Sequence, residues 1–203
     1  MEKERQMRQV RSAASEFTTR EGGDARIIEG YFAVFNSNYE IGPGMSESIA
    51  PGAFSNTLGA DVRALINHDT TLVLGRNKAG TLELREDSHG LWGKIIINPN
   101  DSDAMNLYSR VQRGDVNQCS FGFFITNEET DFRDDGSVHW TIREVELFEV
   151  SCCTFPAYEE TSISARTKER DDLIERRADA WRHKMKERLH HGTESPDASE
   201  EAE

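Results

Sequence analysis

The chain has 203 residues, of which 30% are charged and 36% hydrophobic, and its formal net charge at pH 7 is −13. That length is sufficient for one domain with a hydrophobic core plus a tail. The acidic balance argues against a nucleic-acid-binding protein, which would need a basic face against the phosphates. No apolar segment is long enough to span a membrane and no secretory signal follows Met1, so we expect no membrane contact.

The three cysteines are Cys119, Cys152 and Cys153. An odd number with an adjacent pair does not make a disulfide framework, which favours a reducing compartment. No cysteine–histidine spacing resembles a zinc site, and no organic cofactor is suggested, so we expect neither a metal nor a cofactor.

Residues 1–24 are charged and rich in hydroxyl side chains, and we predict a flexible N-terminal arm. An ordered N-terminal strand is the alternative. The globular region begins at residue 25, and residues 27–35 are β-branched and aromatic, which predicts a strand. Turn residues follow, and a short helical piece is predicted to begin near Pro51 and to run through Leu58.

Residues 61–67 predict a strand that ends at His68-Asp69, and residues 72–76 continue in extended form. Two further strands, 81–85 and 91–97, are joined by a hairpin loop; the first alternates apolar and polar residues. These strands make the middle of the chain mainly β.

Asp101 is a good N-cap and Gly114 a good stop, so we predict a helix over residues 102–113. An aromatic strand follows, with Ser120 near its start. Residues 127–136 are predicted to be a charged loop, and residues 138–153 are predicted to be extended.

The composition changes again near residue 165, which divides the chain into a domain (25–165) and a tail (166–203). Residues 166–191 predict a charged helix with sparse apolar positions, and the acidic end predicts disorder. Strands outnumber helices by about three to one, so we expect an α+β fold with a mostly antiparallel, barrel-like core and a few surrounding helices.

Two side chains compete as nucleophile at the start of the aromatic strand. Ser120 needs a base to remove its proton, and Cys119 is a plausible thiol nucleophile. Alternation along a strand places them on opposite faces, so only one of them can face a given site. Either residue can also be a small packing residue.

His68 is the best candidate for the base among six histidines. It follows an apolar strand, at the boundary between rigid scaffold and loop, where functional residues often lie. The alternative is a turn histidine on the surface. His139 lies on a strand and could face core or solvent, and the others are expected to be solvated: His89, His183, His190 and His191.

Three acids could orient the base: Glu144, Glu146 and Glu149. Glu149 lies among apolar residues and is the one we expect to be buried, which would require a charged or hydrogen-bonding neighbour. Glu144 and Glu146 share the other face of the strand and fit a solvent-facing edge.

An ordered set of short segments now distinguishes this chain. The segments are Gly30-Tyr31-Phe32-Ala33-Val34-Phe35, Ile49-Ala50-Pro51-Gly52-Ala53-Phe54, Asn67-His68-Asp69, Leu74-Gly75-Arg76, Ser120-Phe121-Gly122-Phe123, Leu147-Phe148-Glu149-Val150-Ser151 and Pro156-Ala157-Tyr158. Together they resemble the prohead (capsid maturation) protease family of tailed phages, over roughly residues 26–165.

The resemblance implies a serine endopeptidase with an assemblin-like fold, similar to the herpesvirus proteases. It assigns His68 as general base, Ser120 as nucleophile and Glu149 as third member, with Glu146 or Glu144 still possible. Backbone amides near Gly122, or the side chain of Arg76, are candidates for the oxyanion hole.

The implied substrate is the scaffolding segment of the phage major capsid protein, together with the protease itself, inside the assembling prohead in the host cytoplasm. Self-association is also expected. Two alternatives remain at this point: a non-catalytic scaffolding protein with the same fold, and a cysteine peptidase that uses Cys119.

Overall fold

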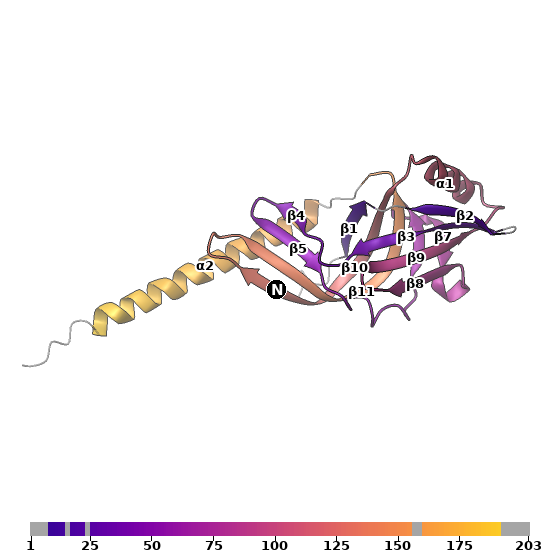
Figure 1. Cartoon of the computed structure of the whole chain (residues 1–203). Helices are drawn as coiled ribbons and strands as arrows, with labels where there is room; N and C mark the ends of the chain where they lie inside the picture. The colour runs from indigo at the N-terminus through magenta and orange to yellow at the C-terminus, as the bar shows by residue number, and fades with distance from the viewer. Residues whose placement is uncertain (1–7, 15–16, 23–24, 156–159, 192–203) are drawn as a thin grey trace, which may run out of the picture. The chain divides into compact units, whose positions relative to one another are not determined.

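The computed structural model describes residues 8–14, 17–22, 25–155 and 160–191. The chain divides into two compact units, residues 1–163 and 164–203. Within the first unit the described strands form two sheets (Figure 1). No helix among the described residues has both the length and the apolar character needed to cross a membrane.

The larger sheet has the path β1-β10-β11-β5-β4, and β6 and β7 branch from β11. Its strands are β1 (Gln9–Ala14), β4 (Tyr39–Gly42), β5 (Met45–Ile49), β6 (Arg63–Ile66), β7 (Asp69–Arg76), β10 (Gln118–Phe132) and β11 (Val138–Cys153). The long strand β11 pairs in parallel with β5 near its start and with β6 near its end. The second half of β11 therefore joins the β10 segment that carries Ser120 to the β6–β7 hairpin that carries His68.

The smaller sheet has the order β2-β3-β9-β8 and is antiparallel throughout. Its strands are β2 (Thr18–Gly22), β3 (Ala25–Val34), β8 (Leu82–Glu86) and β9 (Gly90–Ile97). A continuous core cluster includes side chains from both sheets, among them Ile28, Phe32 and Ile95 from one and Phe121 and Val150 from the other. The two sheets therefore share one hydrophobic core, which fixes the inner face of β10 and β11.

Helix α1 (Ser102–Arg113) has the predicted bounds and caps. The Asp101 side chain accepts from the backbone N–H groups of Asp103 and Ala104, and Gly114 ends the helix in a left-handed conformation. Its buried stripe is Ala104, Leu107, Tyr108 and Val111, and the helix packs beside β2 and β7. A 3-10 turn, η1 (Asn77–Ala79), follows β7.

Several expectations are corrected by the structure. The expected barrel is absent from the described residues, whose strands make two open sheets, although most pairs are antiparallel as predicted. Strands β1 and β2 lie inside residues 1–24, where we expected a flexible arm. Val10 and Arg11 of β1 are buried. This short charged segment is ordered because β1 pairs with β10 in the larger sheet and β2 pairs with β3 in the smaller one.

Two local predictions were also wrong. Residues 51–59 form successive turns rather than a short helix, and residues 127–132 continue β10 rather than forming a loop. In the second case the polar side chains are exposed while the backbone is paired with β11, so composition concealed the strand.

The second unit contains most of helix α2 (Glu160–His191), which has few buried positions and exposes Ile174, Trp181 and Met185. The helix predicted over residues 166–191 is observed with the same end, but it begins six residues earlier, at Glu160. The segment Pro156-Ala157-Tyr158 and the acidic end, residues 192–203, lie outside the described residues.

Candidate active site

The pairing of β10 with β11 creates a small polar face at the end of the larger sheet. Ser120 lies opposite Ser151, and Gly122 lies opposite Glu149. Side chains two positions apart on a strand share a face, so Glu149, Ser151 and Cys153 lie together with Ser120. The alternate residues, such as Cys119 and Val150, face the hydrophobic core.

His68 reaches this face from a tight turn between β6 and β7. Ile66 pairs with Asp69, so Asn67 and His68 form a two-residue hairpin loop. Their φ angles are +48° and +62°, the left-handed values that a type I′ turn requires at both positions. Asparagine tolerates this conformation, but glycine is the usual second residue, and a histidine there carries a conformational cost of about 1 kcal/mol or more.

The turn places the imidazole of His68 against the carboxylate of Glu149. His68 Nδ1 lies 2.7 Å from Glu149 Oε1, and the Glu149 side chain is buried whereas that of His68 is 17% exposed. A carboxylate only accepts hydrogen bonds, so Nδ1 carries the proton and Nε2 is left as the basic nitrogen. This is the arrangement in which an acid orients a histidine base.

Two further groups hold the Glu149 carboxylate. Ser151 Oγ donates to Oε2 at 2.6 Å, and Arg8 Nη2 donates to Oε1 at 2.9 Å. The guanidinium of Arg8 also lies over the ring of Phe148, 4.5 Å from its centroid. Both carboxylate oxygens are therefore occupied, which a buried carboxylate requires.

The second ring nitrogen of His68 faces a thiol. Cys153 Sγ lies 3.6 Å from His68 Nε2, within reach of a weak S–H···N hydrogen bond. Burial, with a smaller contribution from the negative charge of Glu149, raises the pKa of Cys153 to about 12. The thiol is protonated at neutral pH and is a poor nucleophile.

Ser120 is on the same face but is covered. Its side chain has no exposed surface, and its hydroxyl donates to the backbone carbonyl of Arg11 at 2.8 Å rather than to the imidazole. The acceptor belongs to β1, the neighbouring strand in the sheet, in which Ser12 lies directly opposite Ser120. The structure thus joins His68 and Glu149 directly and places Ser120 on the next strand, β10, between β11 and β1.

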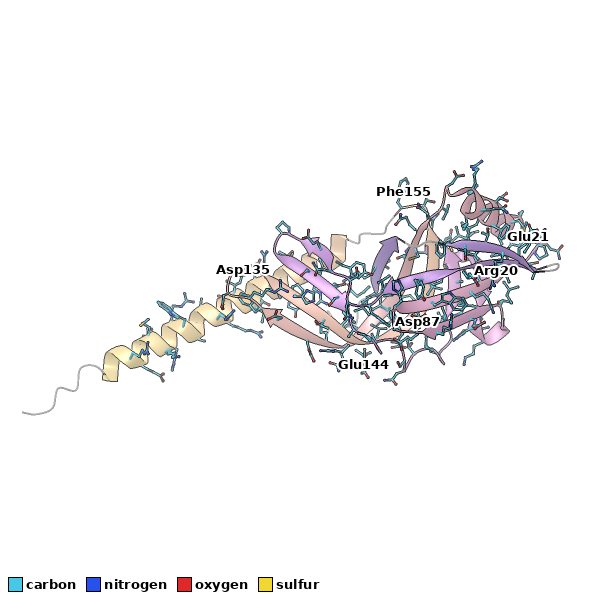
Figure 2. All side chains as sticks on the ribbon, in the orientation of Figure 1. Arg20, Glu21, Asp87, Asp135, Glu144 and Phe155 are labelled. Carbon is cyan, nitrogen blue, oxygen red and sulfur yellow. The ribbon has the colours of Figure 1, made fainter. Side chains whose placement is uncertain are left out.

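The competing candidates lie elsewhere. Cys119 Sγ is in the core, 3.1 Å from the carbonyl oxygen of Tyr31. Glu144 accepts from the side chain of Asn56 at 2.9 Å and lies on the lower side of the domain in Figure 2. Glu146 is exposed. Of the three acids, Glu149 is the one in contact with His68.

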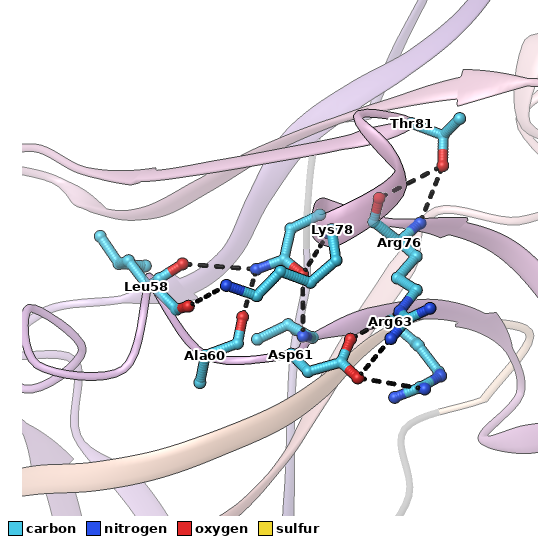
Figure 3. A network of polar contacts seen from close by, with 10 residues as sticks. Leu58, Ala60, Asp61, Arg63, Arg76, Lys78 and Thr81 are labelled. Carbon is cyan, nitrogen blue, oxygen red and sulfur yellow. Dashed lines mark hydrogen bonds and ion pairs between the residues drawn. The ribbon is translucent and has the colours of Figure 1, made fainter.

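The hairpin that carries His68 is anchored at its other end by a polar network (Figure 3). Arg76, at the end of β7, donates twice to Asp61 at 2.7 Å, and Arg63 donates to the same carboxylate at 3.3 Å. These hydrogen bonds, Arg76 first, lower the pKa of Asp61. Arg76 is engaged at the opposite end of β7 from His68, and this location argues against its use as an oxyanion-hole donor.

A second serine–histidine arrangement occurs near the start of β11. His139 Nδ1 lies 2.9 Å from Ser46 Oγ, and its Nε2 lies 2.9 Å from Ser48 Oγ. Burial lowers the pKa of His139, so its ring is neutral and bridges β5 to β11. With its two nitrogens occupied by hydroxyls rather than by a carboxylate, this histidine is part of the scaffold.

Sequence reasoning missed Arg8, Ser151 and Cys153. Alternation along β11 places Ser151 and Cys153 beside Glu149, so the spacing contained that signal. No sequence pattern pointed to Arg8, because it lies in a segment that was expected to be flexible. Within the part of the chain that the structure describes, no group of three or more His, Cys, Asp or Glu side chains is placed to hold a metal ion.

Comparison with known proteins gives three similarities. The model of the family described as "Caudovirus prohead serine protease" matches residues 14–175. The prohead protease of Enterobacteria phage HK97 is 34% identical over 147 residues, which are 70% of this chain and 61% of that protein. The solved structure of the bacteriophage T4 capsid assembly protease covers 72% of this chain and 97% of its own, with 8% identity and a TM-score of 0.49.

Proposed function

The chain belongs to the caudovirus prohead serine protease family, and we propose that it is a serine endopeptidase that cleaves the scaffolding segment of the phage major capsid protein, and itself, during prohead maturation. The observation that carries the proposal is the contact of His68 Nδ1 with the buried Glu149 carboxylate at 2.7 Å, on the face that also holds Ser120. The chain spans 61% of the length of the HK97 relative, so that protein's activity and substrate are proposals for this chain.

The proposed reaction is acyl transfer through Ser120. Ser120 Oγ forms a bond to the substrate carbonyl carbon while His68 Nε2 takes the hydroxyl proton. Glu149 stabilises the imidazolium through the proton on Nδ1. The C–N bond then breaks, the imidazolium gives its proton to the leaving amine, and water releases the acyl group from Ser120 by the same proton transfers in turn.

Ser120 is preferred over the cysteines on geometric grounds. Cys119 faces the core, away from His68. Cys153 touches His68 Nε2, but its raised pKa keeps it protonated. Ser120 shares the His68–Glu149 face, and in the proposed mechanism it is exposed by displacement of the edge strand β1.

Strand β1 must therefore move before a substrate reaches Ser120. β1 is an edge strand of its sheet, and its pairing with β10 occupies the backbone positions that an extended substrate would use. The described conformation is a covered state of the proposed enzyme. Entry of substrate replaces the β1–β10 ladder with a substrate–β10 ladder.

The burial of Ser120 is also the observation that favours the rival function, a non-catalytic scaffolding protein. A fluorophosphonate probe separates the two, because it phosphonylates a serine only where a base activates the hydroxyl. We expect the probe to add to Ser120 in proheads isolated after co-expression with the capsid protein, with the adduct mapped by peptide mass spectrometry. No adduct at Ser120 in proheads that nevertheless contain the full chain would favour the scaffolding function.

The proposed setting is the interior of the assembling prohead in the host cytoplasm, with self-association of the protease there. The division of the chain at residues 163/164 fits a tail whose role is separate from the chemistry. We assign the tail, residues 166–203, to incorporation into the prohead or to removal by self-cleavage. A chain without these residues is expected to retain cleavage of the capsid protein in solution and to be depleted from proheads.

A further inference from the structure

We propose that Ser151 is a positioning residue for the His68–Glu149 pair, acting on both partners through one hydroxyl. Its Oγ donates to Glu149 Oε2 at 2.6 Å and accepts from the backbone N–H of His68 at 3.3 Å. Ser151 itself has no exposed surface. The inference rests on the proposed peptidase function for its activity readout, but its spectroscopic readout is independent of that function.

The turn that carries His68 needs such a contact. Asn67 and His68 both have positive φ, and non-glycine residues remain in that conformation only where their surroundings hold them. The Asn67 N–H donates to the carbonyl of Cys152 at 3.1 Å, and the Asn67 side chain accepts from the N–H of Thr154 at 2.9 Å. Ser151 supplies the contact at His68 itself.

Ser151 also determines which of its two partners, His68 or Arg8, the Glu149 carboxylate binds more fully. The oxygen Oε1 is shared between His68 Nδ1 at 2.7 Å and Arg8 Nη2 at 2.9 Å. The terminal torsion of a glutamate is soft, so a carboxylate held at one oxygen can rotate. A rotated carboxylate could place both oxygens on the guanidinium of Arg8, the geometry that arginine favours. The Ser151 hydroxyl on Oε2 opposes that rotation and keeps Oε1 on the imidazole.

The spectroscopic test uses the low-field proton resonance of His68 Nδ1–H in the full chain, assigned by its loss in His68→Gln. We expect Ser151→Ala to shift this resonance upfield or to broaden it by exchange with water. Ser151→Thr keeps the hydroxyl and is expected to preserve the resonance. The matched control is Ser46→Ala, which removes another serine–histidine hydrogen bond at β11 and should leave the His68 signal unchanged.

The kinetic test uses purified phage capsid protein as substrate. Ser151→Ala should lower the cleavage rate at saturating substrate by about tenfold to a hundredfold, the range expected when a catalytic group is misplaced by a fraction of an ångström to 1 Å. The half-saturating substrate concentration should change little. In a Glu149→Gln background Ser151→Ala should lower the cleavage rate by a much smaller factor, because the effects of substituting residues in contact are not additive.

An unchanged His68 resonance in folded Ser151→Ala overturns the proposal, as does a full additional loss in the Glu149→Gln background. If the alanine variant does not fold, Ser151→Cys replaces it; the thiol keeps the volume but donates weakly, so the resonance must still move. A wild-type chain that does not cleave would count against the proposed function, while the resonance would still decide the role of Ser151.

Discussion

Glu149 Oε1 accepts a hydrogen bond from His68 Nδ1 at 2.7 Å, although the two residues are 81 positions apart in the chain. The contact exists because the end of β11 pairs in parallel with β6, and β6 leads directly into the turn that carries His68. The fold thus delivers an acid and a base to one face from two strands whose sheet pairing is fixed by a shared core.

Glu149→Gln is expected to reduce capsid-protein cleavage by about a thousandfold or more, because an amide does not fix the imidazole tautomer or stabilise the imidazolium. The matched control is Glu146→Gln, which changes an exposed acid on the same strand and should retain nearly full activity. The measurement is the initial rate of cleavage of purified capsid protein. Equal losses of cleavage rate in the two variants would show that Glu149 is not part of the active site.

Gly122→Ala is expected to impair the site through a steric conflict. A methyl group there would meet Glu149 Oε1 well inside van der Waals distance, and the Phe148 ring at 3.0 Å. The carboxylate that holds His68 must shift from its position, so cleavage should fall by about tenfold or more. Gly59→Ala is the control, because the methyl group it adds would lie more than 4 Å from the described residues beyond its chain neighbours, and its φ is not positive. Retained activity in Gly122→Ala would show that Glu149 has freedom to move.

Cys153→Ala is expected to leave cleavage intact, because the proposed role of His68 Nε2 is to take the proton of Ser120 and not that of a thiol. The pKa of Cys153 is raised to about 12, so the thiolate form is absent below about pH 10 and becomes appreciable only as the pH approaches 12. Iodoacetamide at pH 8 should therefore neither label Cys153 in the folded chain nor inhibit cleavage. Loss of cleavage in Cys153→Ala, or rapid alkylation that inactivates the enzyme, would favour a cysteine peptidase.

Arg11→Leu is expected to lower the free energy of unfolding by about 3–5 kcal/mol, because it removes the guanidinium that pairs with the buried carboxylate of Glu47. The double variant Arg11→Leu/Glu47→Leu removes both charges and should be more stable than the single variant. Urea denaturation followed by circular dichroism measures both. A double variant that is less stable than the single one would show that the carboxylate is held by other groups.

Local features of the fold could be predicted from the sequence, whereas features that depend on pairing between distant segments could not. Helix α1 was found with correct bounds because its caps and apolar stripe are local signals. Strand β1 was missed because a short charged segment becomes ordered only through pairing with β10 and burial of Arg11, and no local pattern reports either. A barrel was expected because the strand pattern does not reveal that β11 pairs with two different strands along its length.

In the site too, features with a local sequence signal were predicted and features that depend on distant segments were not. Glu149 was the expected buried acid because it lies among apolar residues, and the structure pairs it with His68. Asn67 was expected to be the last residue of a strand, whereas it forms a turn with His68 in which both residues have positive φ. The hydrogen bond of the Ser120 hydroxyl was not predictable, because its acceptor is the carbonyl of Arg11, 109 positions away in the chain.

Co-expression with the cognate capsid protein tests whether Ser120 is the nucleophile. Intact masses of the capsid subunit and of the protease are compared among wild type, Ser120→Ala, Cys119→Ala and Cys153→Ala. We predict that the subunit is shortened with wild type and both cysteine variants, and that it keeps its full length with Ser120→Ala. A shortened subunit with Ser120→Ala would show that the nucleophile is another residue.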